Sequence, residues 1–428
     1  MATIRKISNV SWRIECYAGS DANGDPVRHS VNYRPKETAP TKIRKEVERF
    51  AAEFEDRVRQ GKYLDGEKMS FAEFTEEWKR LYEKDNVSQT LREHHARMLE
   101  KRILPAIGYM KLRDVKPLHL MSIYRDLEEE GLAPSTIKSY HALIRSIFKC
   151  AFQWEITDSN PCDRCVLPKQ KEKYKYTIWT PDQAQRFLLA LDESYAAYYR
   201  ERVYAKKDGQ IRITSGYQTD LHVAPMFKAL YYLALFSGAR RGELCALTWE
   251  DVDFKKQEIR INKAVAKTES GQIIKEPKTP SAIRRVSIPE VCVKLLRSWH
   301  KEQIQLAFSI GSLWRGYAGK DFNKNYVFIQ QDSGLMINID TIGQKFKSIC
   351  DMYNSHCERD DLKLPDIRFH DLRHTSASLM IANNVDVVTV SHRLGHAKPS
   401  TTMDIYSHAL PLQDKAAANI LSDVIGAE

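Results

Sequence analysis

The chain has 428 residues, which gives room for roughly two or three domains with buried cores. Lys and Arg together number 66 against 56 Asp and Glu, a formal net charge of +10 that favours a polyanionic partner, nucleic acid before membrane. The N-terminus carries no apolar signal segment and no apolar run reaches the length of a membrane span, so we expect a cytoplasmic protein with no membrane partner.

The cysteines do not indicate a disulfide framework, because eight of them are spread from Cys16 to Cys357. Cys162 and Cys165 form the only close pair, and the chain offers neither a second close pair nor nearby paired histidines to complete a zinc site. We expect reduced cysteines, with a metal or redox role for this pair as the alternative.

Residues 1–66 predict a three-stranded sheet backed by one helix. Strand-forming residues fill the run 4–16, and a turn leads to a second such run over 26–33. A helix is predicted over about 41–61, because apolar residues recur there on one stripe.

Basic side chains lie along these predicted strands, where they could follow a groove of duplex DNA. They are Arg5, Lys6, Arg13, Arg28 and Arg34. A basic surface that only faces solvent is the alternative.

Residues 67–168 predict an all-α bundle. Ser70 and Glu73 match a capping box at the start of its first helix, whose inner face is expected to include Leu81. Ser135 is expected to cap the last helix. The helices are expected over about 70–81, 89–104, 117–130 and 135–151.

Residues 169–428 predict a domain that mixes helices with short strands. Thr180 and Pro181 mark a helix start, and an apolar helix over 225–236 leads into the motif Ser-Gly-Ala-Arg-Arg-Gly-Glu-Leu at 237–244. The tyrosine-rich segment 193–219 has no assigned role. Further elements are expected as strands over 251–266, 273–288 and 326–330 and as a helix over 291–307.

The stretch 369–408 brings together a base, a cation, a second imidazole and a phenol. His370 and Arg373 are three residues apart, so they share one face of a helix. His396 and Tyr406 follow. A phenol near arginine and histidine side chains is a candidate nucleophile for a phosphate.

Three short helices are expected in and after this stretch. One covers Val385 to Leu394 and ends at Gly395. Thr401-Thr402 is expected to cap the next, which carries Tyr406, and an amphipathic tail helix is expected over 412–425.

These motifs, in this order, resemble the signature of the tyrosine recombinases, the phage integrase family. The family places its first catalytic arginine in a Gly-x-Arg-x-Gly-Glu-Leu element, which maps to Arg240, and a lysine on a β-hairpin, which maps to Lys278. Glu243 is expected to orient Arg240. The resemblance implies a catalytic set with Tyr406 as the nucleophile: Arg240, Lys278, His370, Arg373, His396 and Tyr406.

The resemblance covers nearly the whole chain and implies three domains. These are an arm-site DNA-binding domain (1–66), a helical core-binding domain with a SAM-like fold (67–168), and an α+β catalytic domain with a tail helix (169–428). The whole is then a multidomain, mainly α protein with small β-sheets.

The implied function is site-specific recombination. The enzyme cuts and rejoins DNA through a 3′-phosphotyrosine intermediate, which mediates integration and excision of a mobile element such as a prophage, a case of viral genome integration. It needs no cofactor, divalent metal or ATP. The implied partners are double-stranded DNA at core and arm attachment sites, further copies in a homotetramer, an excisionase and a host DNA-bending protein, in the nucleoid of a bacterial cell.

Other interpretations stay open at single residues. Arg240 could pair only with Glu243, Arg373 could pair with Asp371, and His396 and Tyr406 could be structural. Three lysines compete with Lys278 in the same hairpin: Lys263, Lys267 and Lys275.

Other functions are also open. His370 and His374 have the spacing of zinc ligands in a hydrolase, but Asp371 stands where that motif has Glu, and Arg373 between the histidines opposes a dication. A type IB topoisomerase uses the same residue types, yet it would not need the N-terminal domain. A DNA-binding protein with an inactive site is opposed by the completeness of the residue set.

Overall fold

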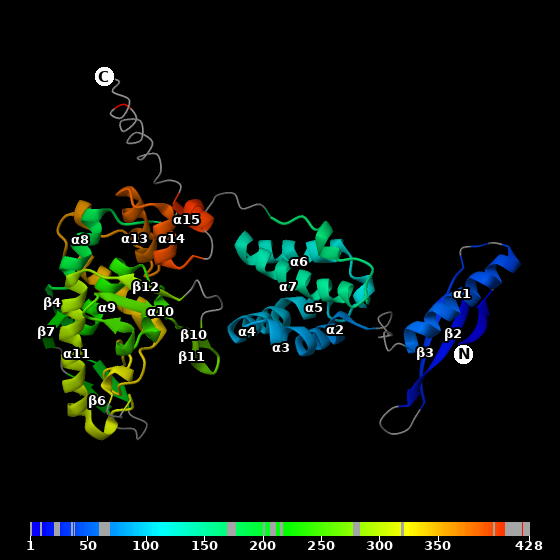
Figure 1. The fold of residues 1–428 in the computed structure, drawn as a ribbon, viewed down its shortest axis with the longest axis horizontal. Helices are drawn as coiled ribbons and strands as arrows, with labels where there is room; N and C mark the ends of the chain where they lie inside the picture. The colour runs from blue at the N-terminus through cyan, green and yellow to red at the C-terminus, as the bar shows by residue number, and fades with distance from the viewer. Residues whose placement is uncertain are drawn as a thin grey trace. The chain divides into compact units, whose positions relative to one another are not determined.

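The computed structural model divides into two compact units, residues 1–173 and 174–428 (Figure 1). It describes residues 2–8, 11–20, 26–35, 37, 39–59, 69–168, 177–199, 202–205, 211–214, 217–276, 283–317, 321–396, 399–406 and 422. Within these ranges, only the backbone is described for residues 8, 18, 20, 27, 57, 59, 196–199, 202–205, 211–214, 217–219, 401 and 404–406. No helix in the described ranges is long and apolar enough to cross a membrane.

The first unit begins with an antiparallel sheet in the order β1-β2-β3. Its strands are β1 (Thr3–Ser8), β2 (Ser11–Ser20) and β3 (Pro26–Tyr33), and α1 (Pro40–Arg59) follows. Ile14 and Val31 pack with Val47 and Phe54 of α1 in a small core. The predicted sheet and helix are confirmed, although the run 4–16 is two strands, because the chain reverses where Ser8 pairs with Ser11.

The rest of the first unit is helical, as predicted, and surrounds a core of its own. Its elements are α2 (Phe71–Trp78), η1 (Lys79–Glu83), α3 (Lys84–Asn86), α4 (Gln89–Met98), η2 (Leu99–Ile103), α5 (Leu104–Ile107), η3 (Leu112–Asp114), α6 (Pro117–Glu129), α7 (Pro134–Gln153) and η4 (Pro161–Arg164). The η1 and η2 segments are π-helical.

Of three local predictions in this bundle, one is confirmed and two are wrong. The capping box is confirmed, since the Ser70 amide donates to Glu73 Oε2 at 2.7 Å. Leu81 was expected inside but is 49% exposed, because the wide turns of η1 bring Tyr82 to the core instead. Ser135 does not cap α7, because Pro134 already occupies the first turn, where its fixed φ suits the helix.

The second unit mixes helices with small antiparallel sheets, again as predicted. Its first half contains α8 (Pro181–Ala190), β4 (Ser194–Tyr199), β5 (Arg202–Ala205), β6 (Ile211–Thr214), β7 (Tyr217–His222), α9 (Pro225–Ser237), α10 (Arg241–Ala246), η5 (Trp249–Asp251), β8 (Val252–Asp253), β9 (Glu258–Ile261), β10 (Ala264–Thr268), β11 (Gly271–Lys275) and β12 (Arg284–Ser287). The second half contains α11 (Glu290–Ile310), η7 (Gly311–Leu313), η8 (Phe322–Lys324), α12 (Ile339–His356), η9 (Asp360–Leu362), α13 (Asp371–Ala382), α14 (Val387–Leu394) and α15 (Pro399–Tyr406). Strands pair in the orders β12-β9-β8, β10-β11, β4-β7 and β5-β6.

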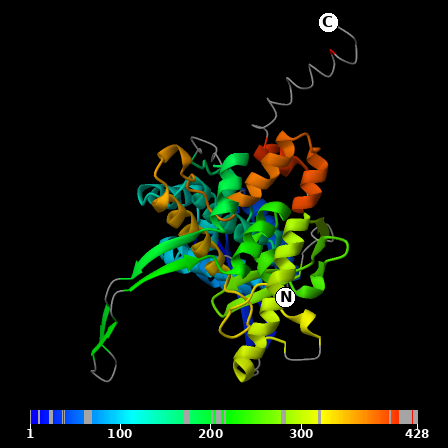
Figure 2. The ribbon, with the colours of Figure 1, turned by 90° about the vertical axis from the view of Figure 1, so that its left-hand side faces the viewer.

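In the segment 193–219, the described residues form strands of a β-arm that projects from the second unit (Figure 2). β4 pairs with β7 from Ser194↔His222 onward, and β5 pairs with β6 farther along the same hairpin. Tyr195 anchors its base: the ring is 3% exposed, and the hydroxyl donates to the Ala190 carbonyl at 3.1 Å.

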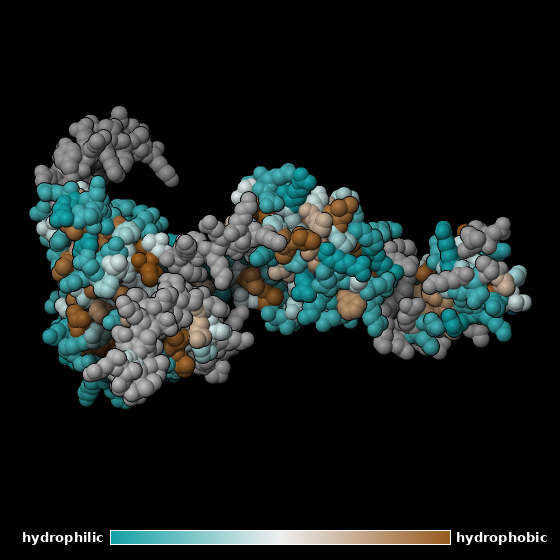
Figure 3. Space-filling view, turned by 90° about the horizontal axis from the view of Figure 1, so that it is seen from above, coloured by the Kyte–Doolittle hydropathy of each residue, from teal (hydrophilic) through white to brown (hydrophobic). Residues whose placement is uncertain are grey.

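The core of the second unit shows one error of prediction and one omission. The expected strand 326–330 is wrong, since Tyr326 and Ile329 make only isolated bridges. The helix α12 was not predicted, although its apolar positions recur with helical spacing and Asn338 caps it. Phe346 of α12 is 1% exposed and packs against the ring of Phe369, directly before the candidate site. On the face seen in Figure 3, hydrophilic residues predominate and hydrophobic ones are scattered.

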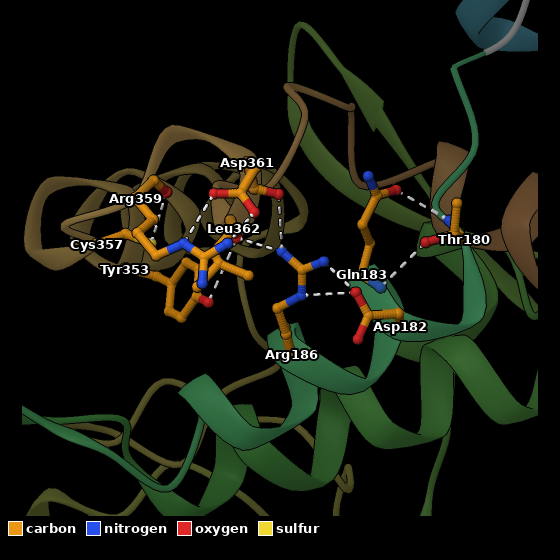
Figure 4. A network of polar contacts seen from close by, with 9 residues as sticks. All are labelled: Thr180, Asp182, Gln183, Arg186, Tyr353, Cys357, Arg359, Asp361 and Leu362. Atoms are coloured by element: carbon orange, nitrogen blue, oxygen red, sulfur yellow. Dashed lines mark hydrogen bonds and ion pairs between the residues drawn. The ribbon is translucent and has the colours of Figure 1, made fainter.

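The start of the second unit is tied to the segment that leads into α13. Arg186 of α8 forms an ion pair with Asp182 and donates to the backbone carbonyl of Leu362 (Figure 4). The Trp179 amide donates to Thr375 Oγ1 of α13 at 3.2 Å, and its indole donates to the Pro365 carbonyl at 3.1 Å. These bonds hold α13 in place beside the core.

Candidate active site

Two glycines shape the backbone around the first arginine motif. Gly238 ends α9 with a φ of +64°, and a Cβ there would lie 2.6 Å from Leu394 Cδ2 of α14. Gly242 lies close to β10, where a Cβ would meet the Val265 carbonyl at 2.4 Å. Arg240, between them, is the N-cap residue of α10. Glycine is therefore required here for close packing as well as for backbone conformation.

The guanidinium of Arg240 is held through both of its terminal nitrogens. Its Nη1 donates to Glu243 Oε1 at 2.9 Å, and its Nη2 donates to the Gly395 carbonyl at 3.2 Å. The side chain is still 40% exposed. The pairing with Glu243 was the structural alternative for Arg240, and it leaves this cationic side chain partly open to solvent, where an anion can approach.

Arg284 is a site residue that the sequence did not reveal. Its side chain is fully buried, with Nη1 and Nη2 donating to the two oxygens of Glu243 at 3.1 and 2.8 Å. Its Nε donates to the Arg393 carbonyl at 2.8 Å. The sequence pattern that could have revealed Arg284 is the alternation along this strand. Arg284 lies on the same face as the buried Val286 and Ile288, so its charged side chain is expected inside the protein.

Glu243 therefore stands between two guanidiniums. Its burial alone raises the pKa of this carboxyl, but the hydrogen bonds and charge of Arg284, with those of Arg240, outweigh burial and hold the pKa below its ordinary value. The carboxylate stays ionised and fixes both arginines.

Arg373 reaches the same place from α13. It is 3% exposed, and its Nη1 donates to the Gly238 carbonyl at 2.8 Å. Asp371, the alternative partner considered for Arg373, accepts from Arg368 at 2.9 and 3.1 Å. The predicted helical placement of Arg373 three residues after His370 is confirmed.

Two histidines lie beside these cations. His370 is the N-cap residue of α13 and reaches solvent, and its ring meets that of His374 edge-on with centroids 5.4 Å apart. Burial of the ring, followed by the charge of Arg373, lowers the pKa of His370. His374 is 6% exposed, and burial lowers its pKa to about 4, so it is neutral at pH 7.

His396 lies in the loop after α14. Gly395 ends that helix with a φ of +69°, as predicted, and its carbonyl accepts the bond from Arg240. His396 Nδ1 lies 2.8 Å from Thr402 Oγ1 of α15. Burial, followed by the charges of Arg373 and Arg240, lowers the pKa of His396 to about 4.

Tyr406 is the last residue of α15, and its side chain lies outside the described residues. The predicted helix is confirmed, but Thr401-Thr402 does not cap it: α15 begins at Pro399, and Thr402 lies inside it, fully buried. The predicted tail helix 412–425 lies outside the described residues except for position 422.

Lys278 also lies outside the described residues. Two of its competitors are engaged elsewhere: Lys263 Nζ lies 3.0 Å from Asp251 Oδ2, and Lys267 Nζ lies 2.5 Å from Asp340 Oδ2. Lys275 also has a partner.

No group of three or more His, Cys, Asp or Glu in the described ranges is arranged to hold a metal ion. Cys162 and Cys165 are free thiols, and burial raises the pKa of Cys162 to about 12.

The five basic residues predicted to contact DNA are exposed; four lie on the first sheet, and Arg34 directly follows β3. Arg13 is already engaged by its neighbours, since its Nε lies 3.0 Å from Glu15 Oε1 and its Nη2 donates to Ser30 Oγ at 3.2 Å.

The arrangement collects cations and neutral imidazoles around one place, and α15, the helix that carries Tyr406, is joined to it through Thr402. Such a set binds an anion that carries two or more acceptor oxygens, and it favours a state with added negative charge.

Two protein-family models match this chain. The Phage integrase family model matches residues 222–412, and the Phage integrase central domain model matches residues 71–166. The ICEBs1 integrase of Bacillus subtilis (strain 168) is 28% identical over 302 residues, which are 70% of this chain and 69% of that protein.

Two further matches extend over more of the chain. A XerC-like tyrosine recombinase of Caldanaerobacter subterraneus subsp. tengcongensis is 25% identical over 429 residues, 96% of each chain. The solved structure of the Tn1549 transposon integrase in complex with transposon right end DNA has a TM-score of 0.64 at 20% identity, covering 83% of this chain and 100% of that one. This last likeness supports the fold.

Proposed function

This chain belongs to the phage integrase family of tyrosine recombinases, and on that premise we propose that it is a site-specific recombinase of a mobile element. It cuts and rejoins DNA through a 3′-phosphotyrosine intermediate and so mediates integration and excision. The observation that carries this function is the pair of guanidiniums, Arg240 and Arg373, bonded to the carbonyls of Gly395 and Gly238 beside His396.

The arginines supply the electrostatic part of the reaction. Attack on a phosphodiester adds negative charge to the non-bridging oxygens, and guanidiniums stay ionised and present paired planar donors. Both are fixed before substrate arrives, Arg240 by Glu243 and Arg373 by the Gly238 carbonyl. Donors fixed in this way stabilise the transition state more than the bound diester, which accelerates the step.

Tyr406 is the nucleophile in this proposal. A phenol has an ordinary pKa of about 10, so on the order of one in a thousand is ionised at pH 7. His370 is neutral and positioned at the start of α13, and it serves to accept or relay that proton. His396 donates a hydrogen bond to the phosphate.

Lys278 is the proposed general acid for the departing 5′ oxygen. The engagement of Lys263 and Lys267 in ion pairs supports this choice among the hairpin lysines. The phosphotyrosine bond keeps the energy of the broken linkage, so a hydroxyl of another strand reverses the step, and the reaction needs neither ATP nor a metal.

We also assign three domains: an arm-site domain (1–66), a core-binding domain (67–168) and a catalytic domain (169–428). The separate hydrophobic cores of the first unit support the division between the first two. The DNA partners are core and arm attachment sites, with arm contacts from the exposed basic residues of the first sheet. The chain acts in the bacterial cytoplasm, at the nucleoid, as a homotetramer with an excisionase and a host DNA-bending protein.

The test is relaxation of a supercoiled plasmid carrying the DNA that flanks the gene, in EDTA and without ATP. Wild-type protein should relax the plasmid and leave a covalent DNA–protein adduct after denaturation, and Tyr406→Phe should lose both. Tyr109→Phe is the matched control, because that side chain is 79% exposed in the helical bundle and is not among the proposed catalytic residues. An adduct that survives in Tyr406→Phe would contradict the assignment of the nucleophile. Joining of two separate DNA molecules distinguishes a recombinase from an enzyme that only relaxes DNA.

A further inference from the structure

The imidazole of His396 offers only one of its two nitrogens to a substrate. Its Nδ1 lies 2.8 Å from Thr402 Oγ1, and Thr402 is 0% exposed on α15. The backbone amide of His396 donates to the Ser391 carbonyl at 3.0 Å, which fixes the residue at the end of α14. Nε2 is therefore the nitrogen left to meet a phosphate beside Arg240 and Arg373.

The state of Nε2 depends on the direction of the Thr402 bond. A neutral imidazole carries one N–H and one bare nitrogen. If Nδ1 donates to Thr402, Nε2 presents a lone pair and repels a phosphate oxygen. If the Thr402 hydroxyl donates to Nδ1, the proton sits on Nε2 and can be donated to the phosphate.

We propose that Thr402 is a positioning residue whose hydroxyl donates to Nδ1 of His396 and holds the imidazole in the tautomer protonated on Nε2. The inference rests on the proposed function, because that function places the scissile phosphate at Nε2. A hydroxyl that is fully buried needs an acceptor for its proton, and Nδ1 is the acceptor that the described contacts provide.

The surroundings of His396 make the choice of tautomer decisive. Burial and the charges of Arg373 and Arg240 hold its pKa near 4, so a second proton is absent at pH 7 and the ring cannot donate from both nitrogens. Thr402 also lies one turn before Tyr406 on α15. The same hydrogen bond therefore attaches the helix that carries Tyr406 and sets the tautomer of His396.

The direct test is the ¹⁵N spectrum of the imidazoles in the full-length chain labelled with ¹⁵N-histidine. His396→Gln identifies the His396 signals by their loss. Near pH 7.5 the wild-type chain should show an unprotonated Nδ1 and a protonated Nε2. Thr402→Val should shift the population towards a protonated Nδ1, and Thr402→Ser should keep the wild-type pattern. A wild-type Nδ1 that carries the proton, or a tautomer unchanged in Thr402→Val, overturns the proposal.

Cleavage kinetics give a second readout that a merely structural role would not produce. At pH 8, Thr402→Val should cleave plasmid about tenfold more slowly than wild type, as expected for one lost hydrogen bond in the transition state, with unchanged DNA affinity. The deficit should narrow only as pH falls towards 4, where His396 begins to take up its second proton, because an imidazolium carries a proton on Nε2 whatever residue 402 is. It should also disappear in a His396→Gln background.

A deficit that is still unchanged at pH 4, or one that adds to the His396→Gln loss, marks a packing defect and overturns the proposal. Failure of the proposed function has a different signature, the absence of a Tyr406-dependent adduct in wild type. The imidazole spectrum tests Thr402 in either case.

Discussion

Glu243 joins two guanidiniums that come from different parts of the fold. Arg240 starts α10 and Arg284 lies on β12, and both donate to the same carboxylate. Removing one partner from a buried ion pair leaves a charge uncompensated, which typically costs several kcal/mol. Arg284 holds the carboxylate of Glu243, and that carboxylate holds Arg240. The geometry of Arg240 therefore depends on Arg284, whose side chain is fully buried.

The buried histidine His374 predicts a loss of stability in acid. Burial lowers its pKa from 6.5 to about 4. Between these two pKa values the unfolded chain binds more protons than the folded chain. The contribution of His374 to the free energy of unfolding is therefore complete above pH 6.5 and is lost as pH falls towards 4. Between pH 7 and 4.5, His374→Gln should lose less unfolding free energy than wild type, by about 2 kcal/mol.

Urea unfolding of the full-length chain at the two pH values measures this difference. His356→Gln is the control, because His356 is exposed at the end of α12. Equal pH dependence in wild type and His374→Gln would mean that His374 is not held neutral by the fold.

At the scale of elements, the turn after α14 positions two parts of the site through one glycine. Gly395 has a φ of +69°, its carbonyl accepts from Arg240, and a Cβ would lie 2.7 Å from Arg284 Nη1. Gly395→Ala should destabilise the chain by about 1–2 kcal/mol from backbone strain alone. It should slow cleavage by more than that strain explains, because Arg284, Arg240 and the adjoining His396 all shift.

Gly131→Ala separates these two effects. Gly131 has a φ of +83° between α6 and α7, and a Cβ there meets nothing within 4 Å. Both variants should show lower melting temperatures, but only Gly395→Ala should lose cleavage per bound enzyme. Equal cleavage by the two would contradict the role of this turn.

Elements with local signals could be predicted from the sequence. The capping box at Ser70, the helix start at Thr180-Pro181 and the glycine stop at Gly395 each act within a few residues, and all three are found. The same reasoning placed a cap at Thr402, but α15 starts earlier, at Pro399, and the hydroxyl bonds to His396 instead.

Long-range partners could not be predicted in this way. Arg284 meets Glu243 across 41 positions of the chain, and Arg373 meets the Gly238 carbonyl across 135. A single sequence shows that such charges exist and that a strand alternates, but only the folded chain shows which carbonyl or carboxylate each guanidinium reaches. The resemblance identified the motifs and their order. The residues that hold the arginines in place, such as Arg284, were found only in the structure.

At the scale of the whole molecule, the net charge of +10 is spread over both units, so DNA affinity should fall steeply with salt. Each cation that neutralises a phosphate contributes about 0.9 to the slope of log affinity against log salt. Arg28 is exposed on β3, whereas Arg13 on β2 already faces Glu15 at 3.0 Å. Arg28→Gln should therefore reduce the slope by about one, and Arg13→Gln should reduce it by clearly less.

The measurement is the affinity of the full-length chain for duplex DNA from the element ends, between low and moderate salt. Adduct formation per bound enzyme should be equal in both variants and wild type, because the first sheet lies in a different compact unit from the proposed catalytic residues. If Arg13→Gln and Arg28→Gln changed the slope equally, the ion pair with Glu15 would not limit the use of Arg13. If neither changed it, the first sheet would not contact DNA phosphates, and the basic residues along its strands would serve only as a solvated surface.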